Sequence, residues 1–222
     1  AKGKFIHNDM VKKENITNAT FALPLERIGS KTETVSAVID NVVVSAKEPE
    51  QDIYNKAAWT GTAESETPTS QGGGKEGVIG MAFDNSSSTH WHSDWSQATK
   101  DKVPTSAGAA GTGKGADGSI WAEVKFDKGY EINQVLFAPR QDTNSGQVTK
   151  ASLYIQTEKD GKWVEVAKDK TFAADKSEKA FTFDKQMVYG FKFVATQSND
   201  GWVTVSEFNI ADKKEIGRAS CR

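Results

Sequence analysis

The amino-acid sequence predicts an all-β protein, an antiparallel β-sandwich, and three observations support this class. Apolar and polar residues alternate over many short runs, which is typical of strands with one buried face. The pair Asp160-Gly161 separates two of these runs and is a strong signal for a hairpin turn. No stretch shows convincing helical periodicity, so short strands in a sandwich or barrel are expected. The alternating runs are residues 59–63, 120–126, 132–137, 151–157, 163–166, 180–183, 189–194 and 203–210.

Residues 1–48 are expected to belong to a different unit. They contain two apolar stretches, residues 20–25 and 35–44, and the second alternates well enough to form a strand. Two strands cannot build a core alone. We therefore interpret residues 1–48 as the C-terminal strands of an upstream β-domain or as a linker, and residues 49–212 as the main domain.

Residues 213–222 follow the last strand pattern and are interpreted as an artificial tail. The single cysteine of the chain, Cys221, lies there, so no disulfide framework is expected in the main domain. The 222 residues carry a formal net charge of −2, which argues against nucleic acid as a partner. No apolar run approaches the roughly 20 residues of a membrane span, and the sequence does not begin with a secretion signal. Insertion into a membrane is therefore not expected.

Residues 82–95 combine two acids, an Asn, several Ser, a Thr, two His and two Trp in one short run. The apolar residues recur at neither helical nor strand spacing, and Asn and Ser in succession favour a tight loop. Such a loop can place several oxygens around one point, as Ca²⁺ requires. The alternative is a polar surface turn with Trp91 and Trp95 in the core, and loop chemistry alone leaves both open.

Residues 96–119 form a long connection dominated by Gly, Ala, Thr, Ser and Lys. They show no periodicity, and a connection of this length is usually functional or mobile. It contains small residues and lysines rather than the exposed apolar tips that insert into membranes.

Five pieces of the sequence stand in a characteristic order: residues 59–63, 82–95, 120–126, 139–142 and 206–208. Together they resemble the signature of discoidin-like (coagulation factor 5/8 C-type) domains. The closest subgroup is the family 32 carbohydrate-binding modules of bacterial glycosidases. The resemblance covers residues 53–212 and implies a jelly-roll sandwich of the galactose-binding-domain type.

The resemblance implies a bound Ca²⁺ between the early loop and the last strand. One hard cation could neutralise two distant carboxylates there. Side-chain ligands would be Asp84, Thr89 and Glu207. Backbone carbonyl ligands would be Met81, Ser86 and Ser206 or Thr89.

The resemblance also implies a sugar site at one end of the sandwich. Arg140 would donate two hydrogen bonds to neighbouring hydroxyls, and Trp202 would stack on the apolar face of a pyranose. Further candidates for the rim of the site are Asn144, Ser145, His90 and Trp95. The histidine that the family commonly has before the strand at Trp121 is replaced here by residues 118–120, Gly-Ser-Ile.

Together these features predict a noncatalytic, calcium-stabilised module that binds terminal sugars, of galactose or N-acetylgalactosamine type. It would target a parent glycosidase to glycans and glycoproteins, mucin included, outside or on the surface of a bacterial cell, as a monomer. The alternatives are an enzyme and an adhesion domain that binds protein or phospholipid. A glycosidase needs two opposed carboxylates, and no pattern in the sequence places such a pair.

Overall fold

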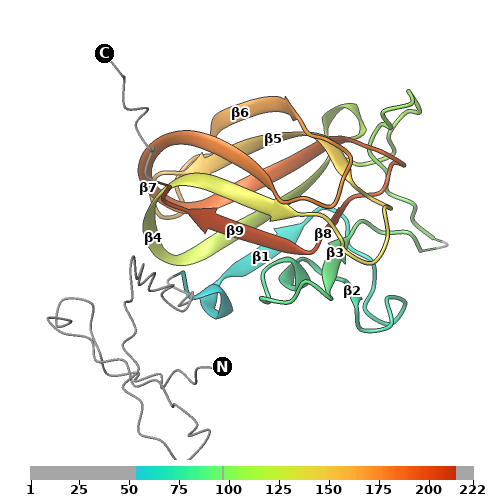
Figure 1. Ribbon diagram of the computed structural model, residues 1–222, viewed down its shortest axis with the longest axis horizontal. Coiled ribbons are helices and arrows are strands. Elements are labelled where there is room, and N and C mark those ends of the chain that lie inside the picture. Colours follow the sequence, from blue (N-terminus) through green and yellow to red (C-terminus); the bar gives the residue numbers. More distant parts are fainter. Residues whose placement is uncertain (1–53, 97, 214–222) are drawn as a thin grey trace, which may run out of the picture. The chain divides into compact units, whose positions relative to one another are not determined.

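The computed structural model describes residues 54–96 and 98–213 (Figure 1). The segment 1–48 and the tail beyond Lys213 therefore lie outside the described residues. The all-β prediction is confirmed: the described part contains strands and short 3₁₀ helices and no α-helix. None of the helices in this part is long and apolar enough to cross a membrane.

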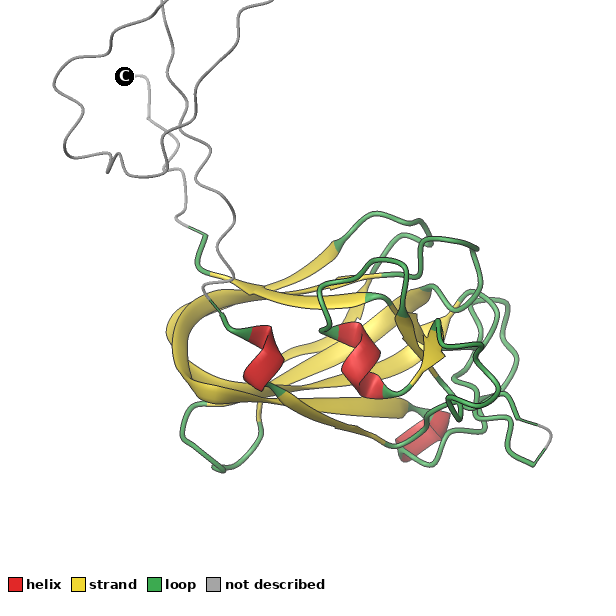
Figure 2. Cartoon of the chain, turned by 90° about the horizontal axis from the view of Figure 1, so that it is seen from below, coloured by secondary structure: helices red, strands yellow, loops and turns green. Residues whose placement is uncertain are grey.

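The larger sheet has six strands in the order β1-β4-β7-β5-β6, with β9 also paired to β4. The long strands β4 and β7 pair along most of their length and curl round, so that the sheet folds over the core (Figure 2). The first half of β4 carries β1 and the second half carries β9. The strand bounds are β1 Thr60–Ala63, β4 Ile120–Ala138, β5 Val148–Gln156, β6 Val164–Thr171, β7 Lys179–Ser198 and β9 Glu207–Ala211.

The smaller sheet has three strands in the order β2-β3-β8 and lies at one end of the larger one (Figure 1). Its β2–β3 pair is parallel and its β3–β8 pair is antiparallel. The strand bounds are β2 Glu76–Gly77, β3 His90–His92 and β8 Thr204–Val205. The 3₁₀ helices are η2 Lys56–Ala58, η3 Ile79–Ala82 and η4 Ala116–Gly118.

The apolar residues at alternate positions of the strands form the core. In β4 every second residue from Ile120 to Phe126 is buried, as expected for a strand with one face turned inward. Phenylalanines dominate the interior; the rings of Phe191 and Phe193 lie 5.1 and 5.4 Å from that of Phe208. Trp91 is fully buried, and its Nε1 donates to the Ser65 carbonyl at 2.9 Å. The loop before Trp91 is thereby anchored to the core.

The long connection 98–119 contains no strand but is held by specific bonds. Val103 is fully buried, and its N–H donates to the Gly201 carbonyl at 2.8 Å. The Lys102 carbonyl accepts from the N–H groups of Thr112 and Gly113 at 2.6 and 2.9 Å. The connection is therefore tied both to itself and to the loop that precedes β8.

Candidate functional site

The candidate site is an open pocket of about 410 Å³ at the end of the domain that carries β2, β3 and β8. Strands β2 and β3 and three loops form its walls, so residues distant in sequence meet there. The three loops are the connection after β3, the turn after β4 and the segment before β8. The lining residues are Glu76, His92, Trp95, Lys100, Lys102, Arg140, Ser145 and Trp202.

Glu76, which the sequence analysis did not single out, is the acceptor that joins the pocket walls. Its Oε1 accepts a hydrogen bond from Trp95 Nε1 at 2.8 Å. Its Oε2 lies 3.3 Å from His90 Nε2 and 3.5 Å from Arg140 Nη1. Parallel pairing of β2 with β3 places Glu76 directly opposite His90, so this carboxylate is positioned by the sheet.

Arg140 lines the pocket, but two of its three guanidinium nitrogens already donate hydrogen bonds within the chain. Its Nε and Nη2 donate to the two carboxylate oxygens of Asp142 at 2.7 and 2.9 Å. These bonds hold the pKa of Asp142 well below its ordinary value. Only Nη1 faces Glu76. Asp142 therefore competes for the two hydrogen bonds that Arg140 is predicted to donate to a sugar.

Trp202 is partly exposed and lines the pocket. The Lys102 ammonium lies 4.3 Å from the centroid of the indole, and the His92 ring centre lies 5.7 Å away. A cation in this position is attracted to the negative face of the ring. A ligand that stacks on Trp202 would therefore meet the Lys102 ammonium at the same ring.

The two histidines of β3 differ in their relation to the pocket. His90, a candidate for the rim, is only 4% exposed and does not line the pocket. Its pKa is lowered to about 4 by burial, with further contributions from Arg140 and His92. His92 lines the pocket instead, and burial also lowers its pKa. Period-2 geometry in β3 puts Trp91 between them into the core.

Ser145 lines the pocket, whereas Asn144 does not. The Ser145 hydroxyl donates to Asp200 at 2.7 Å, and the Gly146 N–H donates to the same carboxylate at 3.0 Å. Gly146 has a φ of +75°, and a Cβ there would lie 2.5 Å from the Thr204 side chain. Its turn thus requires glycine, and it fixes Ser145 next to Trp202.

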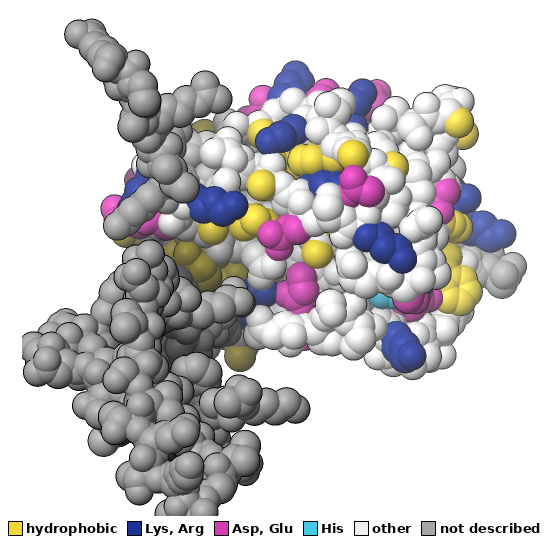
Figure 3. Space-filling view, viewed as in Figure 1, with side chains coloured by type: hydrophobic (Ala, Val, Ile, Leu, Met, Phe, Trp, Pro, Cys, Tyr) yellow, Lys and Arg dark blue, Asp and Glu magenta, His cyan; other side chains and the backbone are white. Residues whose placement is uncertain are grey.

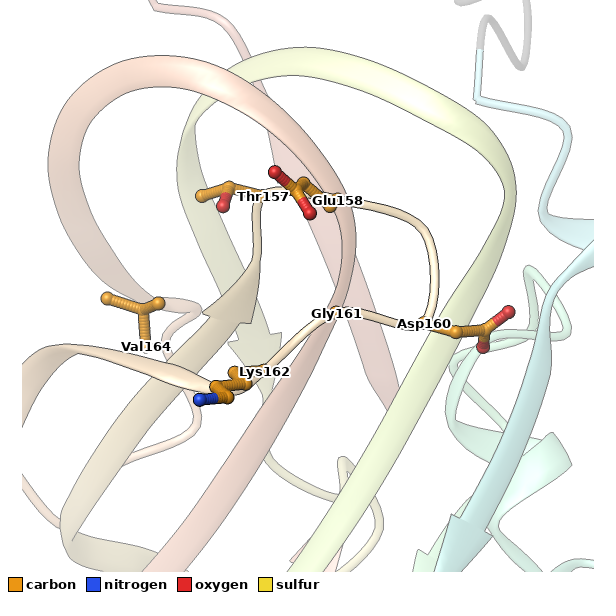
Figure 4. Close-up of a pocket in the computed structure, with 6 residues that line it drawn as sticks. All are labelled: Thr157, Glu158, Asp160, Gly161, Lys162 and Val164. Atoms are coloured by element: carbon orange, nitrogen blue, oxygen red, sulfur yellow. The ribbon is translucent and has the colours of Figure 1, made fainter.

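A second hollow, of about 440 Å³, lies at the β5–β6 turn (Figure 4). It is lined by Thr157, Glu158, Asp160, Gly161, Lys162 and Val164. No aromatic ring lines it, and it sits at the opposite end of β5 from Gly146. It lacks the stacking surface that a sugar site needs.

The two carboxylates predicted to share a metal do come together. The Ser86 N–H donates to Asp84 Oδ1 at 2.9 Å and to Glu207 Oε1 at 2.8 Å. Thr89 Oγ1 donates to Asp84 Oδ2 at 2.7 Å. Asn85 supports this turn with a left-handed φ of +64°, which Asn tolerates better than most residues.

The residues fit a metal poorly, because a cation of the chain already matches Glu207. Lys56 in η2, which is 6% exposed, donates to Glu207 Oε2 at 2.5 Å. Each of the four carboxylate oxygens of Asp84 and Glu207 thus accepts a hydrogen bond from the protein. Burial raises the pKa of Glu207, and Lys56 acts against that shift. Ser206 directs its hydroxyl to the Pro139 carbonyl at 2.9 Å. Nowhere in residues 54–96 and 98–213 do three His, Cys, Asp or Glu side chains form a metal-binding group.

Comparison with known proteins matches these observations. The sequence profile of the F5/8 type C domain matches residues 60–208. The fold thus belongs to a class of β-sandwich binding domains, and the chain is a member of the F5/8 type C domain family.

Solved family 32 carbohydrate-binding modules share the fold. CpGH89CBM32-5 from Clostridium perfringens, in complex with GalNAc-β-1,3-galactose, has a TM-score of 0.57 and 20% identity over 71% of this chain and 97% of that one. The family 32 module of C. perfringens NanJ, in complex with galactose, has a TM-score of 0.55 and 22% identity over 71% and 96%. The A type blood N-acetyl-α-D-galactosamine deacetylase of Flavonifractor plautii is 25% identical over 178 residues, which are 80% of this chain. The matched region is 20% of that enzyme's length.

Proposed function

We propose that residues 54–213 form a noncatalytic carbohydrate-binding module that binds a terminal sugar, of galactose or N-acetylgalactosamine type, in the pocket at Trp202. The observation that carries this proposal is the partly exposed indole ringed by Arg140, Ser145 and His92. An aromatic face with a few polar groups at its edge suits a pyranose, which has an apolar face and peripheral hydroxyls. Family 32 modules with this fold are known in complex with such sugars.

The pocket does not offer the groups that glycoside hydrolysis needs. That reaction uses two carboxyl groups on either side of the scissile bond. Among the lining residues only Glu76 is acidic, and Trp95, His90 and Arg140 surround it. The role proposed is therefore targeting: the module would hold an attached bacterial glycan-processing enzyme on glycoproteins or mucin outside the cell. Weak binding by a single module would be strengthened by multivalency in the parent protein.

Replacing Trp202 by alanine is the direct test. We expect binding of galactose and N-acetylgalactosamine, measured by isothermal titration calorimetry, to weaken by about ten- to a hundredfold, since burying an apolar side chain of this kind contributes about 1.5–3 kcal/mol. Trp121→Ala is the matched control. Trp121 is also partly exposed and carries a lysine ammonium, from Lys192 at 4.4 Å, but lies outside the pocket. Equal affinities of wild type and Trp202→Ala would refute the proposed site.

Calcium is left out of this proposal, because Lys56 supplies the charge that the resemblance assigned to a metal. We expect EDTA to shift the melting temperature by less than about 2 °C. A calcium ion at a hundred times its Kd would add about 2.7 kcal/mol, or roughly 5–10 °C in a domain of this size. Elemental analysis showing one calcium per chain, with a melting temperature that falls on chelation, would restore the calcium site.

A further inference from the structure

The carboxylates around the pocket are already matched by donors of the chain. Glu76 is surrounded by Trp95, His90 and Arg140. Asp142 accepts both bonds of the Arg140 fork. The carboxylates of Glu76 and Asp142 therefore have little remaining capacity to pair with another cation.

Asp200, behind Ser145, is matched in the same way. Its Oδ1 accepts from the N–H groups of Gly146 and Trp202 at 3.0 and 3.2 Å, and its Oδ2 accepts from Ser145. No lysine takes part in these contacts. Asp200 thus gives no acidic partner to the lysines that line the pocket.

Two lysines on the pocket wall remain without an acidic partner. Lys100 and Lys102 both line the pocket, and within the described residues neither lies within 4 Å of a carboxylate oxygen. Elsewhere on the face shown in Figure 3, basic and acidic side chains are interspersed. Both histidines stay neutral at neutral pH, because their pKa values are lowered, so they do not add to this charge.

The backbone at both lysines is held in place, and so is the Lys102 side chain. Thr112 Oγ1 donates to the Lys100 carbonyl at 2.6 Å and accepts from the Lys102 N–H at 3.0 Å. The Lys102 stem runs along Gly201, where a Cβ would lie 3.1 Å from its Cδ. Its ammonium therefore sits over Trp202. A preorganised charge loses less conformational entropy when a ligand binds.

We propose, resting on the sugar-binding function above, that the preferred sugar carries an anionic substituent. Its ring would stack at Trp202, and a carboxylate or sulfate oxygen would accept charge-assisted hydrogen bonds from Lys102 and Lys100. A neutral sugar can satisfy Arg140, Ser145 and His92 but leaves both ammonium groups unmatched. Carboxylate and sulfate share this chemistry, so the experiment must tell them apart.

The test compares rings that differ in one group: galactose, galacturonic acid, galactose 6-sulfate and galactose 3-sulfate, each as the methyl β-glycoside. We expect at least one anionic ring to bind about tenfold more tightly than galactose at 50 mM NaCl, the gain of one charge-assisted bond. The advantage should shrink at 500 mM NaCl, since salt screens exposed charges. Lys102→Gln should bring that ring down to the affinity of galactose. Lys162→Gln, at the β5–β6 turn (Figure 4), should keep the full advantage.

Tighter binding of galacturonic acid would assign the site to carboxylates, and tighter binding of a galactose sulfate would assign it to sulfate esters. Galactose binding as tightly as every anionic ring would overturn the anionic preference and leave the sugar-binding function standing. Binding of none of the four rings, with a folded protein, would remove the proposed function as well.

Discussion

Replacing Lys56 by methionine is expected to lower the free energy of unfolding by about 3–5 kcal/mol. The substitution leaves the Glu207 carboxylate, 8% exposed, buried without the cation that lies 2.5 Å from it. Lys56 and Glu207 are 151 residues apart in sequence, so this ion pair joins η2 to the last strand. Methionine fills a similar volume but carries no charge, so most of the packing at this position is kept. Urea unfolding followed by tryptophan fluorescence measures the difference.

Two further variants separate the ion pair from simple packing loss. Lys56→Met combined with Glu207→Gln keeps an oxygen for the Ser86 N–H and removes the unpaired charge, so we expect it to recover much of the loss. Lys125→Met breaks an exposed pair with Asp160 and should cost less than about 1 kcal/mol. If Lys56→Met were as stable as Lys125→Met, the buried pair would not be what holds η2 to β9.

The strands were predictable because alternation reports directly on burial, but their ends were not. Residues 120–126 and 132–137 were expected as two strands, and the structure joins them in β4. The intervening Asp127, Lys128 and Gly129 look like a turn, yet pairing with β7 resumes at Tyr130 after a register shift. Local turn chemistry carries no information on a distant partner strand.

The pocket could be predicted only where a residue belongs to a local pattern. Arg140, Ser145, Trp95 and Trp202 followed from the family resemblance, and all four line one pocket. The charged residues that pair with a partner distant in sequence could not be predicted. Lys56, Glu76 and Lys102 stand in no motif, and each gains its role from a partner brought near by the fold. An isolated lysine or glutamate in a sequence is most often a solvated surface residue.

Replacing Arg140 by alanine is expected to weaken sugar binding by about 30- to 150-fold, the equivalent of about 2–3 kcal/mol for lost charge-assisted hydrogen bonds. The Arg140 side chain is only 11% exposed and lies between Glu76 and Asp142. Without it both carboxylates lose their cation, and Glu76 would repel an anionic sugar. Titration calorimetry with the best ligand from the galactoside series measures the loss.

Arg140→Lys separates charge from shape, because an ammonium keeps the charge but cannot form the planar fork to Asp142. We expect it to bind with an affinity between those of Arg140→Ala and wild type. Lys192→Ala is the matched control: it removes a partly buried cation, paired with Glu123 at 2.9 Å, that does not line the pocket. It should bind as wild type does. If Arg140→Ala keeps full affinity while its melting curve shows a folded protein, the pocket at Trp202 is not where the sugar binds. That outcome would also refute the anionic preference assigned to Lys102, because this preference requires the sugar to bind in the same pocket.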